Sequence, residues 1–189
     1  MKSASLQPVT IVLIAICVVV AAISGLGENA AVLSPLFIVD PTQAERGLSM
    51  ELWRWVTPAF IHFGPIHLLF NMMWLWDLGR AIEFRKGSAF YLVFVLVLAV
   101  AAHLAQYFIT GKPEFGGMSG VVYGFLGYVW IMGRRSPRFG MALPQQTVLI
   151  MGGWFLLCWT GLLGPIANWA HAAGLGLGVA WAFVESSRR

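Results

Sequence analysis

The stretch GKPEFGGMSGVVYGFLGYVWIMG, from Gly111 to Gly133, joins a loop to an apolar helix that is short for a membrane span. Three glycines and Pro113 precede Ser119 and exclude a helix there. From Ser119 to Gly133, a helix rising about 1.5 Å per residue reaches about 22 Å, against about 30 Å of hydrocarbon. Irregular backbone at membrane depth needs protein or water around it, so we expect Ser119 below the membrane surface, in a cavity.

The composition of the whole chain indicates a membrane protein. Of 189 residues, 59% are hydrophobic and 11% are charged, whereas soluble domains have about 25% charged residues. The net charge of +4 is spread in short clusters between apolar segments, which indicates membrane orientation rather than nucleic-acid binding. Cys17 and Cys158 lie far apart in apolar stretches and fit packing rather than a disulfide or a metal site. No linker or convincing repeat divides the chain, so we expect one domain over residues 1–189.

Six apolar segments are candidate membrane spans, and they predict an all-α polytopic membrane protein. A straight crossing takes about 20 residues, with a range of about 17–25, and the fourth candidate falls short of it. A long first loop carries Trp53, Trp55, Phe60 and Phe63, which are typical of the membrane interface. The candidate spans run roughly over residues 8–25, 65–82, 88–109, 119–133, 147–163 and 167–184.

Lysine and arginine residues predict the orientation of this arrangement. Nine fall on the side of the termini and three on the other, which places both termini in the cytoplasm. Spans two, four and six then run from outside to inside, and all three begin with polar residues. We therefore expect His67, Asn71, Ser119 and His171 at one depth near the outer face. The inner set is Lys2, Arg80, Arg85, Lys86, Arg134, Arg135, Arg138, Arg188 and Arg189, and the outer set is Arg46, Arg54 and Lys112.

The first apolar segment has a second interpretation. Lys2, the apolar run and the small residues of Ala22-Ile23-Ser24-Gly25 also fit a secretory signal with its cleavage site. The charge count barely separates the two, because the other five spans keep their orientation. The run from Val9 to Gly25 is longer than a usual signal core, which favours a retained helix.

Ser119 and His171 are the candidate catalytic pair, because a hydroxyl that attacks and an imidazole that takes its proton are the minimum for nucleophilic catalysis. Gly174 and Gly178 share a helix face with His171 and can approach a matching small face of the fourth helix. The alternative is packing, because serine and glycine are common helix-contact residues in membranes. His171 would then hydrogen-bond to a neighbouring helix. The serine motif of soluble hydrolases does not apply, since it joins a strand to a helix.

His67 and Asn71 lie four residues apart and share one face of the second helix. As donors aimed at a developing oxyanion, both residue types suit the same chemistry. A zinc site is the alternative, but no third ligand has a suitable spacing, and asparagine is a poor zinc ligand. We expect neither a metal nor a cofactor.

The other polar residues offer no third member for the catalytic pair. We interpret His103, in the third span, and His62, in the first loop, as structural. Asp77 lies near the cytoplasmic end of the second span and Glu83 lies further still, on the wrong side for His171. Five other acidic residues lie in predicted outer loops without a motif: Glu28, Asp40, Glu45, Glu51 and Glu114. The sequence therefore favours a serine–histidine dyad.

Five short motifs, in this order, make the chain resemble the rhomboid intramembrane serine proteases of the compact bacterial, GlpG-like type. The resemblance covers about Glu51 to Val184 and leaves no departure at the catalytic positions. An extra soluble domain or a seventh helix is missing, so the chain resembles the minimal six-helix core. The motifs are Trp53-Arg54, His67-x-x-x-Asn71, Gly79-x-x-x-Glu83-x-x-x-Gly87, Gly117-Met118-Ser119-Gly120 and Ala170-His171-Ala172-Ala173-Gly174-Leu175-Gly176-Leu177-Gly178.

The resemblance implies roles for the matching positions. Ser119 would be the nucleophile and His171 the general base and then acid. The backbone N–H of Ser119 would form the oxyanion hole together with Asn71 and His67. Tyr123, one turn below Ser119, would pack against the His171 ring. Structural roles would fall to Arg54 and Glu83.

The implied substrates are transmembrane segments of other membrane proteins, cut near their outer end in the bacterial inner membrane. A helix ties up its own amides, so Gly, Pro or polar residues near the cleavage site should help the substrate unwind. The short stretch Gly164–Trp169 would cap the site. Trp154 and Phe155, facing Phe70 or Trp74, would form a side gate, although aromatic residues there also fit plain packing or lipid contact.

Two other function classes remain as alternatives. A catalytically silent rhomboid-like scaffold would bind membrane helices without cutting them, and the intact Ser119 and His171 count against it. A channel or transporter is disfavoured by the scarcity of charges at mid-membrane and by the absence of a detectable inverted repeat.

Overall fold

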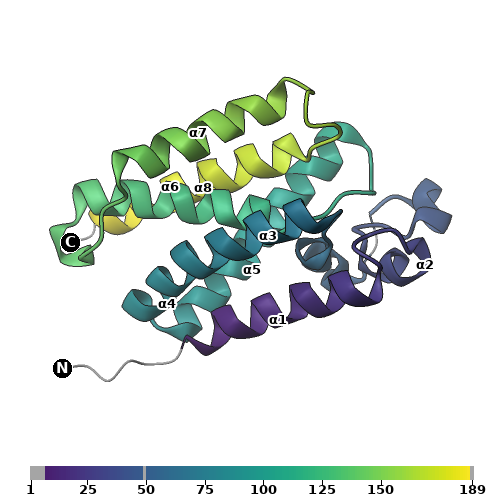
Figure 1. Cartoon of the computed structure of the whole chain (residues 1–189), viewed down its shortest axis with the longest axis horizontal. Helices are drawn as coiled ribbons and strands as arrows, with labels where there is room; N and C mark the ends of the chain where they lie inside the picture. Colours follow the sequence, from purple (N-terminus) through teal and green to yellow (C-terminus); the bar gives the residue numbers. More distant parts are fainter. Residues whose placement is uncertain (1–6, 49, 188–189) are drawn as a thin grey trace.

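The computed structural model describes residues 7–48 and 50–187, and in this part of the chain the regular secondary structure is all helical, with no strand. The all-α fold class is therefore confirmed. Figure 1 shows the long helices gathered in one bundle, with short helices and turns of the first loop at one end. The α-helices are α1 (Pro8–Ile23), α2 (Ala30–Leu33), α3 (Pro65–Trp74), α4 (Arg80–Lys86), α5 (Ser88–Thr110), α6 (Ser119–Arg135), α7 (Gln145–Trp159) and α8 (Asn168–Ser187). Tighter 3-10 turns are η1 (Ser34–Leu36), η2 (Pro41–Arg46), η3 (Leu52–Trp55), η4 (Thr57–Phe60) and η6 (Pro137–Phe139).

The second predicted span is longer than expected and is not uniform. A wide π-helical turn, η5 (Leu75–Gly79), joins α3 to α4, so the helical path runs on to Lys86 instead of ending near residue 82. The fifth span, expected over residues 147–163, begins at Gln145 and ends at Trp159. The other predicted boundaries differ by a few residues, because apolar patterns mark helix ends only loosely.

Length and composition single out one helix as a membrane span. Among the described residues, α5 alone is both long and apolar enough to cross a bilayer, while Pro8–Ile23 is apolar but shorter. The helix α6 has 17 residues and α7 has 15, at or below the lower end of the usual range of about 17–25. Six spans therefore stay a prediction.

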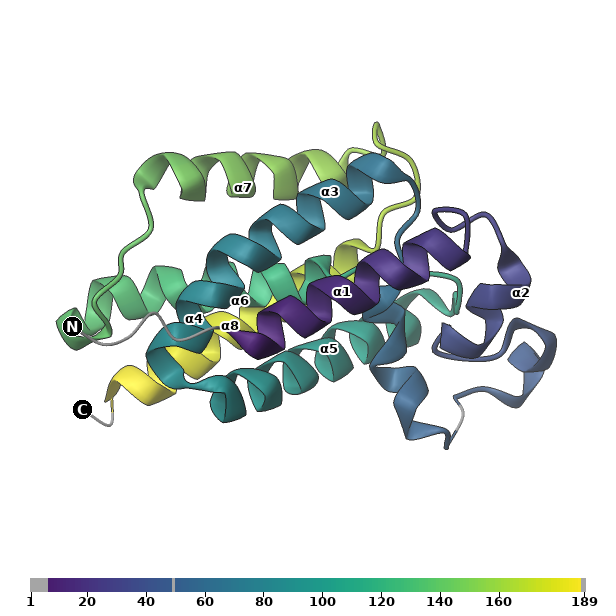
Figure 2. The same ribbon diagram turned by 60° about the horizontal axis from the view of Figure 1, so that its bottom comes forward.

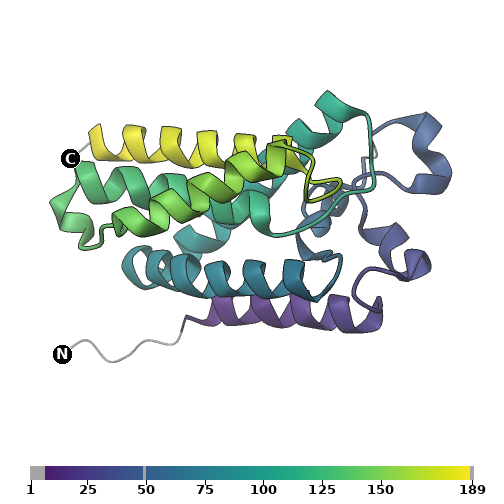
Figure 3. The ribbon, with the colours of Figure 1, turned by 45° about the horizontal axis from the view of Figure 1, so that its top comes forward.

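The centre of the bundle is α6. Most of its residues from Gly120 to Met132 are buried, and it contacts α8, α5, α3 and η5. Figure 3 shows α1 and α3 running side by side, with α6, α7 and α8 above them. In Figure 2, α7 lies along the edge of the bundle next to α3. Ser119, at the start of α6, is thus surrounded by other helices although its own helix is short.

Glycines allow α6 and α8 to touch backbone to backbone. A Cβ on Gly174 would overlap the carbonyl oxygen of Gly120, and one on Gly178 would overlap that of Gly124. Leu98 of α5 fills the opposite side, where a Cβ on Gly124 would lie 2.5 Å from its Cδ2. Close packing of small residues is a main source of helix association in membranes. The start of α8 is therefore held against the start of α6.

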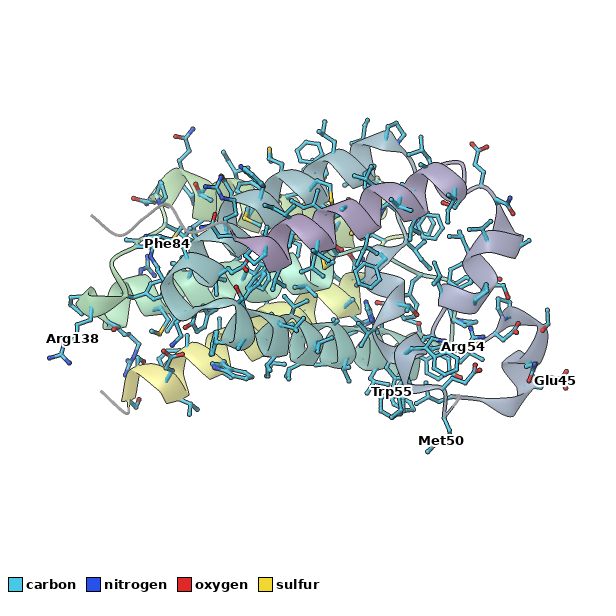
Figure 4. The ribbon with its side chains drawn as sticks, turned by 90° about the horizontal axis from the view of Figure 1, so that it is seen from below. Glu45, Met50, Arg54, Trp55, Phe84 and Arg138 are labelled. Atoms are coloured by element: carbon cyan, nitrogen blue, oxygen red, sulfur yellow. The ribbon has the colours of Figure 1, made fainter. Side chains whose placement is uncertain are left out.

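The two ends of the bundle carry different parts of the chain. The beginning of α1 and the end of α8 lie at one end, and the first loop lies at the other (Figure 1). Figure 4 places Arg138 and Phe84 at the first end and Glu45, Met50 and Arg54 at the second. At the first end, Lys86 Nζ lies 2.6 Å from Glu185 Oε1 and the Tyr128 hydroxyl donates to Glu185 Oε2 at 2.9 Å.

Glu83 fastens α1 to the rest of the bundle. Its carboxylate accepts hydrogen bonds from the backbone N–H groups of Val9 (3.0 Å) and Thr10 (2.9 Å). The hydroxyls of Thr10 and Ser88 donate to it at 2.7 Å each. The first turn of α1 has no side-chain cap of its own, so Glu83 supplies the missing acceptors to this helix end.

Arg54 fastens the first loop in a similar way. Its guanidinium donates to Glu51 and to the carbonyl oxygens of Ser34 (2.8 Å) and Phe37 (3.2 Å). A buried guanidinium satisfied by two carbonyls and one carboxylate holds separate turns of the loop together.

Candidate active site

Ser119 and His171 meet at the N-terminal ends of α6 and α8. The Nε2 atom of His171 lies 2.8 Å from Oγ of Ser119, although the two residues are 52 positions apart in the chain. Ser119 is the first residue of α6, and His171 lies in the first turn of α8. The glycine contact between the two helices sets this distance, because it fixes both backbones close to each other.

The ring of His171 is held from one side by Tyr123. The two ring centroids are 4.8 Å apart at an angle of 42°, and the Tyr123 hydroxyl donates to the carbonyl of Met151 in α7 at 3.2 Å. His171 is buried, and its Nδ1 has no hydrogen-bond partner among the described residues. The geometry is therefore that of a pair rather than a triad.

His67 presents an N–H toward the same place. Its Nδ1 accepts a hydrogen bond from the backbone N–H of Phe63 at 3.2 Å, so the neutral ring carries its proton on Nε2. A Cβ built on Gly117 would lie 2.7 Å from this Nε2 and 3.5 Å from Ser119 Oγ. His67 Nε2 and Ser119 Oγ thus border the space that Gly117 leaves empty.

The loop before Ser119 is packed against the first loop rather than exposed. Gly117 has a φ of +123°, which L side chains rarely adopt, and its N–H donates to the carbonyl of Pro58 at 2.9 Å. A Cβ on Gly116 would lie 2.5 Å from Cβ of Ile61. Glycine is thus required at both positions, by backbone conformation at one and by close approach at the other.

Asn71 lies on the same face of α3 as His67 but is engaged differently. Its Nδ2 donates to the carbonyl of His67 at 2.9 Å, within its own helix. An amide nitrogen carries two N–H groups, so one donor remains after this bond is made. Among the described residues, Asn71 makes no hydrogen bond to Ser119 or His171, so its link to the pair runs through His67.

His62 and His103 have structural partners. His62 is fully buried in the loop before α3, with Nδ1 3.2 Å from the Phe60 carbonyl and its ring 5.0 Å from that of His67. Burial, with a smaller contribution from His67, lowers the pKa of His62 to about 3, so it adds no charge beside His67 at neutral pH. His103 Nδ1 lies 2.8 Å from the carbonyl of Trp55.

One of the aromatic contacts predicted between the second and fifth spans is present. Phe70 of α3 and Trp154 of α7 stack with their ring centroids 5.5 Å apart at 23°. Phe155 does not face Phe70 or Trp74 as expected. It packs edge-on against Tyr123, with centroids 5.4 Å apart at 74°, because successive helix residues point about 100° apart.

Sequence patterns missed one polar residue at the site. Gln106 of α5 reaches the start of α8, where its Oε1 accepts from the N–H groups of Trp169 (3.1 Å) and Ala170 (3.2 Å). The sequence gives only an indirect signal for such a contact. Ala167, which precedes α8, has no side-chain acceptor for the first N–H groups of that helix. Among the described residues, no three His, Cys, Asp or Glu side chains are grouped as metal ligands.

The site and fold define an α-helical protein in which a serine and a histidine meet at the tops of two closely packed helices. The Rhomboid domain family model matches residues 49–188, from the first loop through α8. The chain belongs to the rhomboid family, and it is therefore a membrane protein.

Proposed function

We propose that this rhomboid is an intramembrane serine endopeptidase of the compact bacterial, GlpG-like type, acting through Ser119 and His171. The observation that carries the proposal is the 2.8 Å contact between His171 Nε2 and Ser119 Oγ. A hydrogen bond of this length lets the imidazole accept the hydroxyl proton as the oxygen attacks a carbonyl carbon.

The reaction follows from this geometry in two stages. Ser119 Oγ attacks the scissile carbonyl while His171 Nε2 takes its proton, and the resulting imidazolium gives that proton to the leaving amine. Water then attacks the acyl-enzyme, with His171 again as base, and releases the second product. Tyr123 positions the ring from one side, in place of the acid that orients histidine in a triad.

Three donors would stabilise the developing oxyanion: the Ser119 N–H, His67 and Asn71. The N–H groups of the first turn of α6 have no acceptor within their helix, and that of Ser119 is the first of them. His67 Nε2–H borders the same space, and Asn71 has one N–H left after its bond to His67. Each such donor is worth about 2.7–4 kcal/mol in a serine protease.

The substrates we propose are transmembrane segments of other membrane proteins. The site lies at the end of the bundle that carries the first loop, whereas the basic loops and the beginning of α1 lie at the opposite end. With six spans and cytoplasmic termini in the bacterial inner membrane, the site opens toward the outer side. Stacked Phe70 and Trp154 stand between α3 and α7, where a substrate helix would enter.

The test is labelling of the purified protein with a fluorophosphonate, a serine-directed probe, with the modified residue located by mass spectrometry. Ser119→Ala and His171→Ala serve as controls, and a recombinant transmembrane substrate is incubated with each protein. We expect labelling at Ser119 and cleavage, both lost in the two variants. Absence of labelling and of cleavage in the unmutated protein contradicts the proposal and favours the silent scaffold.

A further inference from the structure

The helix that carries His171 begins without a cap of its own. Of the N–H groups in its first turn, that of Asn168 donates to the Ile166 carbonyl and that of His171 to the Ala167 carbonyl. Ala167 offers no side-chain acceptor, and the Asn168 side chain donates to the Cys158 carbonyl at 3.0 Å instead of capping. The N–H groups of Trp169 and Ala170 are thus left to a partner outside the helix.

Gln106 supplies that partner from α5. Its Oε1 accepts from both N–H groups, at 3.1 Å from Trp169 and 3.2 Å from Ala170. Because both partners are donors, the atom facing them is the amide oxygen rather than the nitrogen. Such bonds to the second and third residues of a helix are those of an N-cap, here made by a buried side chain of another helix.

The same part of α5 also contacts the Ser119 side of the site. The Cβ of Ala102 would lie 2.8 Å from a Cβ on Gly120. The ring of His103 lies against that of Phe115, in the loop that leads to Ser119, with centroids 5.8 Å apart and the planes tilted by 46°. Residues 102–106 of α5 therefore border the start of α6 on one side and the start of α8 on the other.

We propose that Gln106 is a positioning residue for His171. This inference rests on the proposed function, because it concerns the base of that reaction. His171 directly follows Ala170, so fraying of the two bonded amides moves the imidazole away from Ser119 Oγ. A displacement of about 1 Å at a reacting group can cost about 100-fold in rate. Unsatisfied amides at membrane depth are also costly, which makes a borrowed acceptor effective there.

The experiment compares Gln106→Leu, which removes the acceptor at similar size, with Gln106→Glu, which keeps an oxygen at the helix N-terminus. Thr110→Val is the matched control. The Thr110 hydroxyl donates at 2.7 Å to the backbone carbonyl of Gln106, so its loss removes a hydrogen bond from the same turn without touching α8. Fluorophosphonate labelling rates are measured per folded protein, together with thermal unfolding. Hydrogen exchange at the start of α8 is followed by mass spectrometry.

We expect Gln106→Leu to slow labelling by about 10- to 100-fold and to speed exchange at the start of α8, and Gln106→Glu to restore most of both. Thr110→Val should leave both unchanged. The inference is overturned when Gln106→Leu lowers only the melting temperature, or when Gln106→Glu behaves like Gln106→Leu. Exchange needs no activity, so an unlabelled wild type with fast exchange in Gln106→Leu contradicts the proposed function but not the cap.

Discussion

The helices α7 and α8 are neighbours in the chain, yet they join the bundle in opposite ways. The backbone of α8 lies directly on that of α6, where Gly174 and Gly178 leave no room for a Cβ. Two residues of α7 are buried, against twelve of α6. Glycines of α7 have open space around them, since a Cβ on Gly152 or Gly153 would meet no atom within 4 Å. The proposed catalytic pair, Ser119 and His171, thus lies at the tight contact between α6 and α8, and the more loosely packed α7 lies beside it.

The largest effect should follow from placing a methyl group inside the tight contact. In Gly174→Ala the new Cβ overlaps the backbone carbonyl oxygen of Gly120, which cannot rotate away as a side chain would. Overpacking costs about 1–3 kcal/mol and sometimes more. The shift of α8 also separates His171 from Ser119, so we expect labelling to fall by about 100-fold or more. Thermal unfolding and fluorophosphonate labelling measure the two effects.

Gly176→Ala is the matched control, two residues along the same helix. A Cβ there meets nothing within 4 Å, so stability and labelling should stay at the wild-type level. Equal damage from both substitutions would show that any added bulk in α8 is harmful, and the tight contact would lose its special status.

The second effect should come from removing a hydrogen-bond donor beside Ser119 without changing the contact between α6 and α8. His67→Ala removes the Nε2–H that borders Ser119 Oγ, at a site where one donor is worth about 2.7–4 kcal/mol. We expect turnover to fall by about 100- to 1000-fold, with the melting temperature nearly constant. A loss of activity that is matched by a loss of folded protein would make His67 a structural residue instead.

The third effect concerns the contact between α3 and the loosely packed α7. The stacked pair Phe70 and Trp154 joins α3 to α7, and such pairs are worth about 0.5–1.5 kcal/mol beyond their buried area. If α3 and α7 must separate to admit a transmembrane substrate, Trp154→Ala should raise the cleavage rate of that substrate by about 2- to 12-fold. Labelling by the small fluorophosphonate probe should stay unchanged.

Leu156→Ala is the control on the same helix, because Leu156 is 68% exposed and lies outside the stack. It should change neither rate. A rise in probe labelling in Trp154→Ala would mean that the substitution altered the proposed catalytic pair rather than the contact between α3 and α7.

The contact between α6 and α8 is more predictable from the sequence than the packing of α7. Glycines spaced four apart after His171 mark one helix face, and a short fourth segment after a glycine-rich loop places Ser119 at a helix start. These are local patterns, and the structure has both features.

Contacts made across the fold left no comparable trace in the sequence. Gln106 caps a helix more than sixty residues away, and no local pattern pairs the two. The π-helical turn at Leu75–Gly79 interrupts a run without a helix breaker at its start. Phe155 was assigned to the gate because periodicity alone does not say which neighbour each face meets, and its ring packs on Tyr123.

The smallest effect should come from the glycines of α7. Glycine in a helix interior is less favourable than alanine by up to about 1 kcal/mol, and Gly152→Ala adds a methyl group where nothing lies within 4 Å. We therefore expect a slightly higher melting temperature and wild-type probe labelling, the opposite of Gly174→Ala. Thermal unfolding of Gly152→Ala, Gly153→Ala and the double variant measures this gain. Destabilisation instead would mean that α7 is packed as tightly as α8, and the contrast between the two helices would fail.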